Sequence, residues 1–509
     1  MILFILSLII AIIAIILIGQ KSKYFLHMLQ LEGYNSIQFQ KWINSNREKA
    51  FSFKIDKGET KKPLVFTNRA KRLYGTNLGL NILLITLFVI RMGGFGTNPS
   101  SSIYFTIFAL LVYIILLGAM YYLQPFFMLI ANNIILPIEN RINLGFYKQA
   151  QEKIKSRTDL TVVGITGSFG KTSTKFIVGT ILGEKYKVLN TPESYNTPMG
   201  LSKVINNNMT EEHEIFIAEL GARNIGDIKE LGELVKPKIG VITSIGPTHL
   251  ETFKNMDNIM KTKYELVEEL PTDGIAIFNY DNEYIRKLAD KTFKEKILYG
   301  LEETENLDLY AEDIEVSEFG STFTIKDKEG NSVRCTTKLL GKHNIYNILA
   351  GVAVAKALGL SFEEIKSGVE KIEPIPHRLN IINPGTGIII IDDAFNSNPI
   401  GARAALEVLS QFKEGRKIIV TPGMVELGAM EEEANREFGV NIGKVCDYVI
   451  LVGEKRTRPI YEGLMEVNFN EDNIFVVNTL DEATGCIQKL ARPKDVVLFE
   501  NDLPDNYNE

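Results

Sequence analysis

The residue run Thr-Gly-Ser-Phe-Gly-Lys-Thr-Ser at 166–173 has the composition of a loop that binds phosphate. Its glycines let consecutive backbone N–H groups curl around phosphate oxygens, and Lys171 adds a compact positive charge. Thr172 adds a hydroxyl that can bind Mg²⁺. The run differs from the strict Walker pattern, because Ile165 stands at the position of the first glycine. A fortuitous glycine-rich turn is the alternative, but the apolar strand before the run and the helix after it favour a phosphate site.

Two more polar side chains follow apolar strands in the sequence. A strand expected over 214–218 ends at Glu219, and a strand expected over 239–245 leads to His249. The carboxyl ends of parallel strands meet at the crevice where α/β proteins bind ligands. We therefore expect Glu219 and His249 to lie near the phosphate loop, where both could bind a cation. For His249, a surface or hydrogen-bonded core histidine is the ordinary alternative.

An α/β fold must position these residues. From about Thr158 onward, β-branched apolar runs alternate with helical stretches, beginning with a strand over 160–165 and a helix expected to start near Thr174. This alternation predicts a parallel sheet with crossover helices in a central domain, 156–376. Further apolar runs predict a smaller Rossmann-like domain over 377–509, with strands at 388–391, 417–420, 448–452 and 495–499.

Three of these runs resemble the central-domain motifs of the Mur ligases of bacterial cell-wall synthesis: residues 166–173, Glu-Leu-Gly-Ala at 219–222 and Thr-His-Leu-Glu at 248–251. The resemblance implies an ATP-dependent carboxylate–amine ligase. In that reaction a carboxylate attacks the γ-phosphate of ATP to form an acyl phosphate, and an amine then displaces phosphate. The likeness is greatest to members that add D-alanyl-D-alanine to a muramoyl tripeptide, which implies a role in peptidoglycan biosynthesis.

The resemblance also assigns roles to single residues. Lys263, in Lys-Thr-Lys-Tyr-Glu at 261–265, would be a carbamylated lysine that binds a second Mg²⁺, and a solvated helix lysine is the alternative. The implied ATP contacts are Gly167, Ser168, Gly170, Lys171, Thr172, Ser173, Asn344, Asn347, Arg378 and Asp393. Among them, Asn344 and Asn347 would contact the adenine, and Asp393, in the loop 392–399, would reach the ribose. The implied metal ligands are Thr172, Glu219, His249 and Lys263, and the implied catalytic residues are Lys171, Lys263, His249 and Arg378. Arg378 would also mark the hinge to the last domain.

The first 150 residues have the pattern of a membrane region. Apolar runs predict transmembrane helices over 2–19, 78–96 and 103–123, the first as an uncleaved anchor. Between the first two spans, residues 20–77 contain twelve Lys or Arg and four Asp or Glu. By the positive-inside rule this segment faces the cytoplasm, so the domains after the spans are cytoplasmic too. The apolar stretch 125–138 is short and contains two asparagines, which predicts an interfacial or packed segment.

Composition excludes some other classes of protein. The formal net charge of −6 over 509 residues argues against a general nucleic-acid binder, which needs a basic face. The cysteines, Cys335, Cys446 and Cys486, are far apart and predict ordinary reduced thiols.

Two alternatives remain for the function. The membrane region occupies the place of the domain that holds a UDP-sugar in the Mur ligases. The carboxylate donor could therefore be a lipid-linked or other surface-polymer precursor. A nucleotide-binding membrane scaffold with degenerate catalysis is the second alternative. The joint presence of Lys171, Thr172, Glu219, His249 and Lys263 argues against it.

Overall fold

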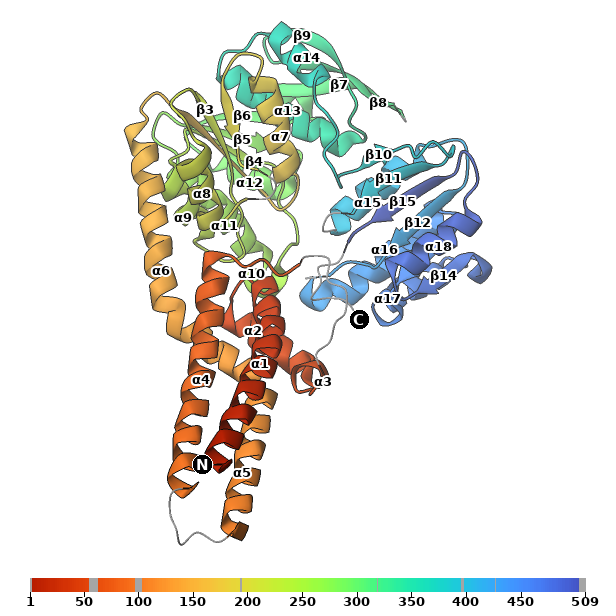
Figure 1. The fold of residues 1–509 in the computed structure, drawn as a ribbon. Helices are drawn as coiled ribbons and strands as arrows, with labels where there is room; N and C mark the ends of the chain where they lie inside the picture. Colours follow the sequence, from red (N-terminus) through yellow and green to blue (C-terminus); the bar gives the residue numbers. More distant parts are fainter. Residues whose placement is uncertain are drawn as a thin grey trace. The chain divides into compact units, whose positions relative to one another are not determined.

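The computed structural model describes residues 2–54, 63–96, 103–192, 195–317, 319–394, 398–425 and 427–502. The chain divides into two compact units, one with the described residues up to Gly145 and one with those from Phe146 onward (Figure 1).

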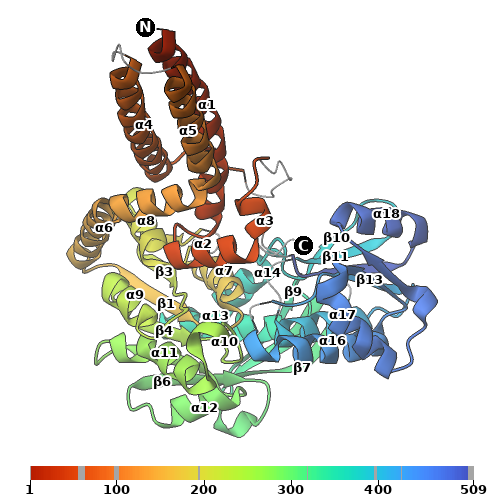
Figure 2. The ribbon, with the colours of Figure 1, turned by 90° about the horizontal axis from the view of Figure 1, so that it is seen from below.

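All the regular secondary structure of the first unit is helical within the residues described. Its helices are α1 (Ile2–Leu31), α2 (Ser36–Ser45), α3 (Arg47–Ala50), α4 (Asn68–Gly96), α5 (Ile103–Tyr122) and the first part of α6 (Gln124–Ser156). Helices α1, α4 and α5 lie side by side (Figures 1 and 2). The stretches Ile5–Leu31 and Asn68–Arg91 are long and apolar enough to cross a membrane, and α5 with the bent start of α6 could form a third span.

Four buried polar side chains form a hydrogen-bonded chain inside this helical unit. Asn77 donates to Ser22 Oγ over 3.2 Å, and Asn81 donates to Asn77 Oδ1 over 2.9 Å. Gln124 donates to Asn81 Oδ1 over 2.8 Å. Because the neighbouring side chains are apolar, these groups must satisfy one another, and their bonds connect α1, α4 and α6.

The second unit begins with a nine-stranded sheet of order β2-β3-β1-β4-β5-β6-β7-β8-β9. Neighbouring strands are parallel as far as β7, and β7, β8 and β9 form an antiparallel extension. The strands are β1 (Thr161–Thr166), β2 (Val188–Asn190), β3 (Ile215–Glu219), β4 (Ile239–Ile242), β5 (Ile275–Asn279), β6 (Glu295–Gly300), β7 (Leu309–Ser317), β8 (Gly320–Asp327) and β9 (Ser332–Thr337).

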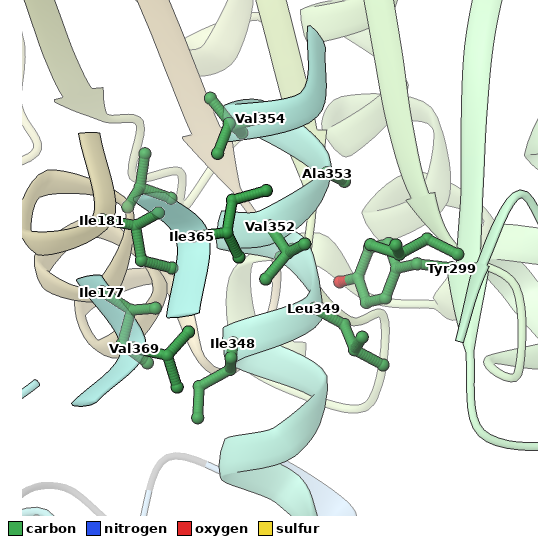
Figure 3. Close-up of a cluster of buried hydrophobic side chains, with 14 of the residues drawn as sticks. Ile177, Ile181, Tyr299, Ile348, Leu349, Val352, Ala353, Val354, Ile365 and Val369 are labelled. Carbon is green, nitrogen blue, oxygen red and sulfur yellow. The ribbon is translucent and has the colours of Figure 1, made fainter. Parts of the chain in front are cut away.

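Helices cover the central strands β1, β3, β4 and β5, which are buried along almost their whole length, as is usual for a parallel sheet. They are α7 (Lys171–Leu182), α8 (Pro198–Asn208), α9 (Asp227–Val235), α10 (Leu250–Phe253), α11 (Met256–Glu269), α12 (Glu283–Asp290), α13 (Lys342–Ala357) and α14 (Phe362–Glu370), with the short 3₁₀ turn η1 (Thr304–Asn306). Figure 3 shows the apolar contact among α7, α13 and α14, with Ile177, Ile348 and Ile365 among the side chains in it. This core holds α7, and hence the loop before it, firmly in place.

A six-stranded sheet of order β10-β11-β15-β12-β13-β14 follows, parallel except for β10. Its strands are β10 (Asn380–Ile382), β11 (Ile389–Asp393), β12 (Lys417–Thr421), β13 (Tyr448–Val452), β14 (Ile474–Val477) and β15 (Val496–Glu500). Its helices are α15 (Pro399–Ser410), α16 (Glu431–Val445), α17 (Glu454–Glu466) and α18 (Leu480–Leu490), with 3₁₀ turns η2 (Gly428–Met430) and η3 (Glu471–Asn473). The predicted fold class, helices followed by two α/β sheets, is confirmed.

Candidate active site

A pocket of about 540 Å³ opens in the second unit at the carboxyl ends of β1, β3 and β4. Strand β1 lies between β3 and β4, so at this edge the connection after β1 runs toward β2 on one side, while the connection after β3 runs toward β4 on the other. Such a switch point is where open parallel sheets bind ligands. Of the predicted site residues, those lining the pocket are Gly167, Ser168, Gly170, Lys171, Thr172, Ser173, Glu219, His249, Lys263 and Arg378.

The phosphate loop joins β1 to α7 and is anchored to the loop after β4. The N–H of Ser168 donates to Ser244 O over 2.7 Å, and the N–H of Phe169 donates to Ser244 Oγ over 2.9 Å. Ser168 Oγ donates to Gly246 O over 2.9 Å. Because residues after Ile242 make these contacts, β4 ends there, and the expectation of a strand through residue 245 was wrong.

Gly170 starts α7 in a backbone conformation that few other residues adopt. Its φ is 78°, and a Cβ built on it would lie 2.6 Å from Asn347 Oδ1. A side chain there would both strain the backbone and collide with α13. The helix therefore begins at Lys171 rather than near Thr174, and its N-terminal end lines the pocket.

Lys171 is held against the loop that it follows. Its Nζ donates to Gly167 O over 2.8 Å and to Ser168 O over 3.3 Å. Burial lowers the pKa of Lys171, while the charge of Glu219 acts to raise it and that of Arg378 to lower it. Several cationic groups thus converge beside the N-terminal end of α7, which favours the binding of a polyanion.

Glu219 lies at the end of β3, and both of its carboxylate oxygens have partners. Lys175 Nζ donates to Oε2 over 3.1 Å, and Asn196 Nδ2 donates to Oε1 over 3.1 Å. The side chains of Lys175 and Glu219 are 0% and 1% exposed, so their ion pair is fully buried. The pair fixes the direction of the carboxylate at the wall of the pocket.

His249 and Lys263 reach the pocket from the segment after β4. His249 has a left-handed backbone with φ of 49° and directly precedes α10. Lys263, on α11, is 2% exposed. Burial and, second, the charge of Lys171 lower the pKa of Lys263 to about 7, while Asp227 and Glu265 act in the opposite direction. A large share of this amine is therefore uncharged near neutral pH.

Asn344 and Asn347, on α13, lie behind the phosphate loop and do not line the pocket. Asn347 Oδ1 accepts from Thr174 Oγ1 over 3.1 Å, and Asn347 Nδ2 donates to Asn344 Oδ1 over 3.2 Å. Asn344 Nδ2 in turn donates to Leu340 O over 2.9 Å. These contacts tie α13 to α7, and the adenine contacts expected of the two asparagines stay a prediction.

Asp393 ends β11 close to Arg378. Its Oδ1 accepts from the N–H of Leu379 over 3.2 Å. Burial raises the pKa of Asp393 to about 6, although the charge of Arg378 acts to lower it. Residues 395–397 of the predicted ribose loop lie outside the described residues, so the ribose contact of Asp393 also stays a prediction.

Two family models match this chain: the Mur ligase middle domain over residues 165–355 and the Mur ligase, glutamate ligase domain over residues 377–500. The UDP-N-acetylmuramoyl-tripeptide--D-alanyl-D-alanine ligase of Bacillus subtilis is 31% identical over 341 residues, which are 67% of this chain and 72% of the relative. The chain belongs to the Mur ligase family. The ligase of the same name from Haemophilus influenzae is 31% identical over 320 residues, 61% of this chain and 68% of the relative.

Solved structures agree with this assignment to the Mur ligases. MurF from Acinetobacter baumannii has a TM-score of 0.65 and 27% identity, and the match covers 72% of this chain and 78% of that one. MurF from Thermotoga maritima, in complex with ADP, has a TM-score of 0.63 and 26% identity over 71% of this chain and 80% of that one. As a Mur ligase, the chain is an ATP-dependent amide ligase, as predicted.

Sequence reasoning did not single out several residues in and around this Mur ligase site, among them Lys175 and Asn196. Lys175 follows Lys171 by one helical turn, so both face the same side of α7, and this spacing was an available signal. Asn196 had no comparable signal, because it lies in a loop and meets Glu219 only through the fold.

Proposed function

We propose that this Mur ligase uses ATP and Mg²⁺ to join D-alanyl-D-alanine, or a similar amino acid or peptide, to a muramoyl-peptide precursor at a membrane. The observation that carries the proposal is the convergence of Lys171, Glu219, Lys263 and Arg378 on one pocket at the phosphate loop. The names of the relatives supply the substrate class, because the Bacillus subtilis and Haemophilus influenzae proteins are both tripeptide–D-alanyl-D-alanine ligases.

The residues of the pocket suit a reaction between anions. A carboxylate oxygen of the donor attacks the γ-phosphorus of ATP, the bond to the β-phosphate oxygen breaks, and ADP leaves. The amine of the acceptor then attacks the acyl carbon, loses a proton and expels phosphate. The protein must position the reactants and offset their negative charge, which Lys171, Arg378 and the N-terminal end of α7 do.

The donor set also fits a magnesium ion. Thr172 and Glu219 present oxygen atoms, which Mg²⁺ prefers, and His249 adds an imidazole at the same pocket. Among the residues described, no group of three or more His, Cys, Asp or Glu is placed to hold a metal ion. Phosphate oxygens of ATP and water would supply the other ligands. The ion would supply further charge neutralisation at the phosphates.

Lys263 is proposed to carry a carbamate, formed when its neutral amine adds CO₂ and releases a proton. Because the pKa of Lys263 is about 7, the carbamate fraction should rise as the pH increases through that value. Protein incubated with ¹³C-bicarbonate should show a carbamate carbon by NMR. The variant Lys263→Arg should lack the signal and Lys261→Arg, at an exposed position on the same helix, should keep it. A spectrum that is the same for wild type and Lys263→Arg would refute the carbamate.

We also propose that the helical unit holds the enzyme in the cell membrane, with the residues after the spans in the cytoplasm as central (156–376) and C-terminal (377–509) domains. The support is the apolar length of Ile5–Leu31 and Asn68–Arg91, together with the basic segment between them. This arrangement favours one second candidate, the same chemistry on a lipid-linked precursor, which would be confined to the same surface.

The test is phosphate release from ATP by the full chain in detergent. The carboxylate donor is either UDP-muramoyl tripeptide or its lipid-linked counterpart, and D-alanyl-D-alanine is the amine. With the UDP-linked donor we expect phosphate release, and this release should depend on the presence of both the donor and the dipeptide. Release only with the lipid-linked donor would replace the first candidate by the second. If neither donor supports phosphate release, both proposed donor substrates are wrong.

A further inference from the structure

The first half of α6 is apolar on two opposite sides. Met128, Leu129, Ala131 and Ile135 are buried in the core of the helical unit. A second set, at every fourth position, faces outward: Phe126 is 41% exposed, Ile130 50%, Ile134 50% and Ile138 56%. A spacing of four residues keeps side chains along one side of a helix, so these four form a continuous exposed stripe. We call it the α6 stripe.

The position of the α6 stripe in the chain indicates what covers it. Helix α6 follows the apolar helix α5 directly, and the two are bent by 65° at the break between Tyr122 and Gln124. If α5 crosses a bilayer, a helix bent by that angle lies much closer to the membrane plane than to the membrane normal. A helix in that orientation, uncharged from Gln124 to Ile138, places its exposed apolar side against lipid.

Charged residues begin immediately after the stripe. Glu139 is bound by Arg72 of α4 through two hydrogen bonds, Nε to Oε1 over 2.6 Å and Nη2 to Oε2 over 2.9 Å. The side chain of Arg72 is 38% exposed, so this ion pair reaches the surface of the helical unit. An ion pair at the end of an apolar stripe is the pattern expected where acyl chains give way to headgroups.

We propose that α6 lies in the interface of a lipid bilayer from Phe126 to Ile138, with the α6 stripe among the upper parts of the acyl chains. The inference rests on the membrane attachment proposed above and goes beyond it. It makes α6 a second kind of membrane contact, inclined closer to the membrane plane than to the membrane normal, in addition to the spans. A second protein copy on the stripe is the competing occupant, and the test separates the two.

The test uses tryptophan as a depth reporter in the full chain. The single native tryptophan, Trp42, stacks on Phe39 and is first replaced by phenylalanine, which keeps an aromatic ring there. Ile134→Trp and Ile130→Trp report on the α6 stripe. Leu111→Trp reports on α5, where the side chain is exposed, and Leu480→Trp on the exposed surface of α18. Each protein is reconstituted into phosphatidylcholine–phosphatidylglycerol vesicles with and without lipids brominated at the upper acyl carbons.

We expect brominated lipid to lower the tryptophan fluorescence of Ile134→Trp and Ile130→Trp at least twofold, while aqueous iodide leaves this fluorescence unchanged. Leu480→Trp should respond only to iodide, and Leu111→Trp only to lipid. If Leu111→Trp is quenched by lipid but both stripe reporters respond to iodide, the interfacial helix is wrong and membrane attachment stands. If the stripe reporters respond to neither quencher, a protein contact covers them and the proposal is overturned. If Leu111→Trp is not quenched by lipid, the membrane attachment itself fails.

Discussion

Replacing Lys171 with alanine is expected to lower kcat for ATP-dependent ligation by about a thousandfold, the effect of removing a preorganised charge from a phosphoryl-transfer site. Lys171 is the cation that the phosphate loop itself contributes, held through Gly167 O and Ser168 O. Its loss should change the binding of substrates less than the rate of the chemical step. The reason is that negative charge at the transferring phosphoryl group must be offset most strongly in the transition state.

The measurement is phosphate release by the full chain, with kcat and KM for ATP determined separately. Lys261→Ala serves as the control, because it removes an exposed lysine from the same unit and should retain wild-type activity. Unfolding temperatures of the two variants should be similar. If Lys171→Ala keeps kcat within tenfold of wild type, the loop is not where the γ-phosphate reacts.

Replacing Lys175 with methionine is expected to destabilise the second unit by about 3–5 kcal/mol, the usual cost of removing one partner of a buried ion pair. The variant leaves the carboxylate of Glu219 buried, with the 3.1 Å hydrogen bond from Asn196 to Oε1 but without the cation on Oε2. A loss of that size is a large part of the stability of a typical domain.

Thermal unfolding of the full chain in detergent measures this effect. The double variant Lys175→Met/Glu219→Gln should recover part of the loss, because the amide needs no counter-charge. Lys328→Met is the matched control. It breaks the 2.6 Å ion pair with Asp308, in which Lys328 is 63% exposed, and should cost less than about 1 kcal/mol. Equal losses for the Lys175 and Lys328 variants would show that the buried pair contributes little.

The phosphate loop could be predicted because its parts are consecutive in the sequence. A buried strand, a glycine-containing turn and a helix carry their own signals, and β1 and α7 lie where those signals place them. The strands expected at 417–420 and 448–452 are likewise found as β12 and β13. In each case the pattern of apolar residues determines the local structure.

The contacts around Glu219 could not be predicted in the same way. Lys175 and Asn196 are 44 and 23 residues away from it in the sequence, and only the packing of α7 on the sheet brings them together. The end of β4 was missed for a related reason. Thr243 and Ile245 are β-prone in type, but the backbone of Ser244 between them binds the phosphate loop instead of a neighbouring strand.

The buried chain of hydrogen bonds from Ser22 through Asn77 and Asn81 to Gln124 gives the helical unit specific polar contacts between its helices, in addition to apolar packing. Each amide in that chain depends on a partner from another helix, so α1, α4 and α6 form a matched set. Substitution of one of these polar residues by leucine would leave its partner as an unsatisfied polar group in apolar surroundings. These positions are therefore expected to change together during evolution, while the outward-facing apolar residues exchange freely among themselves.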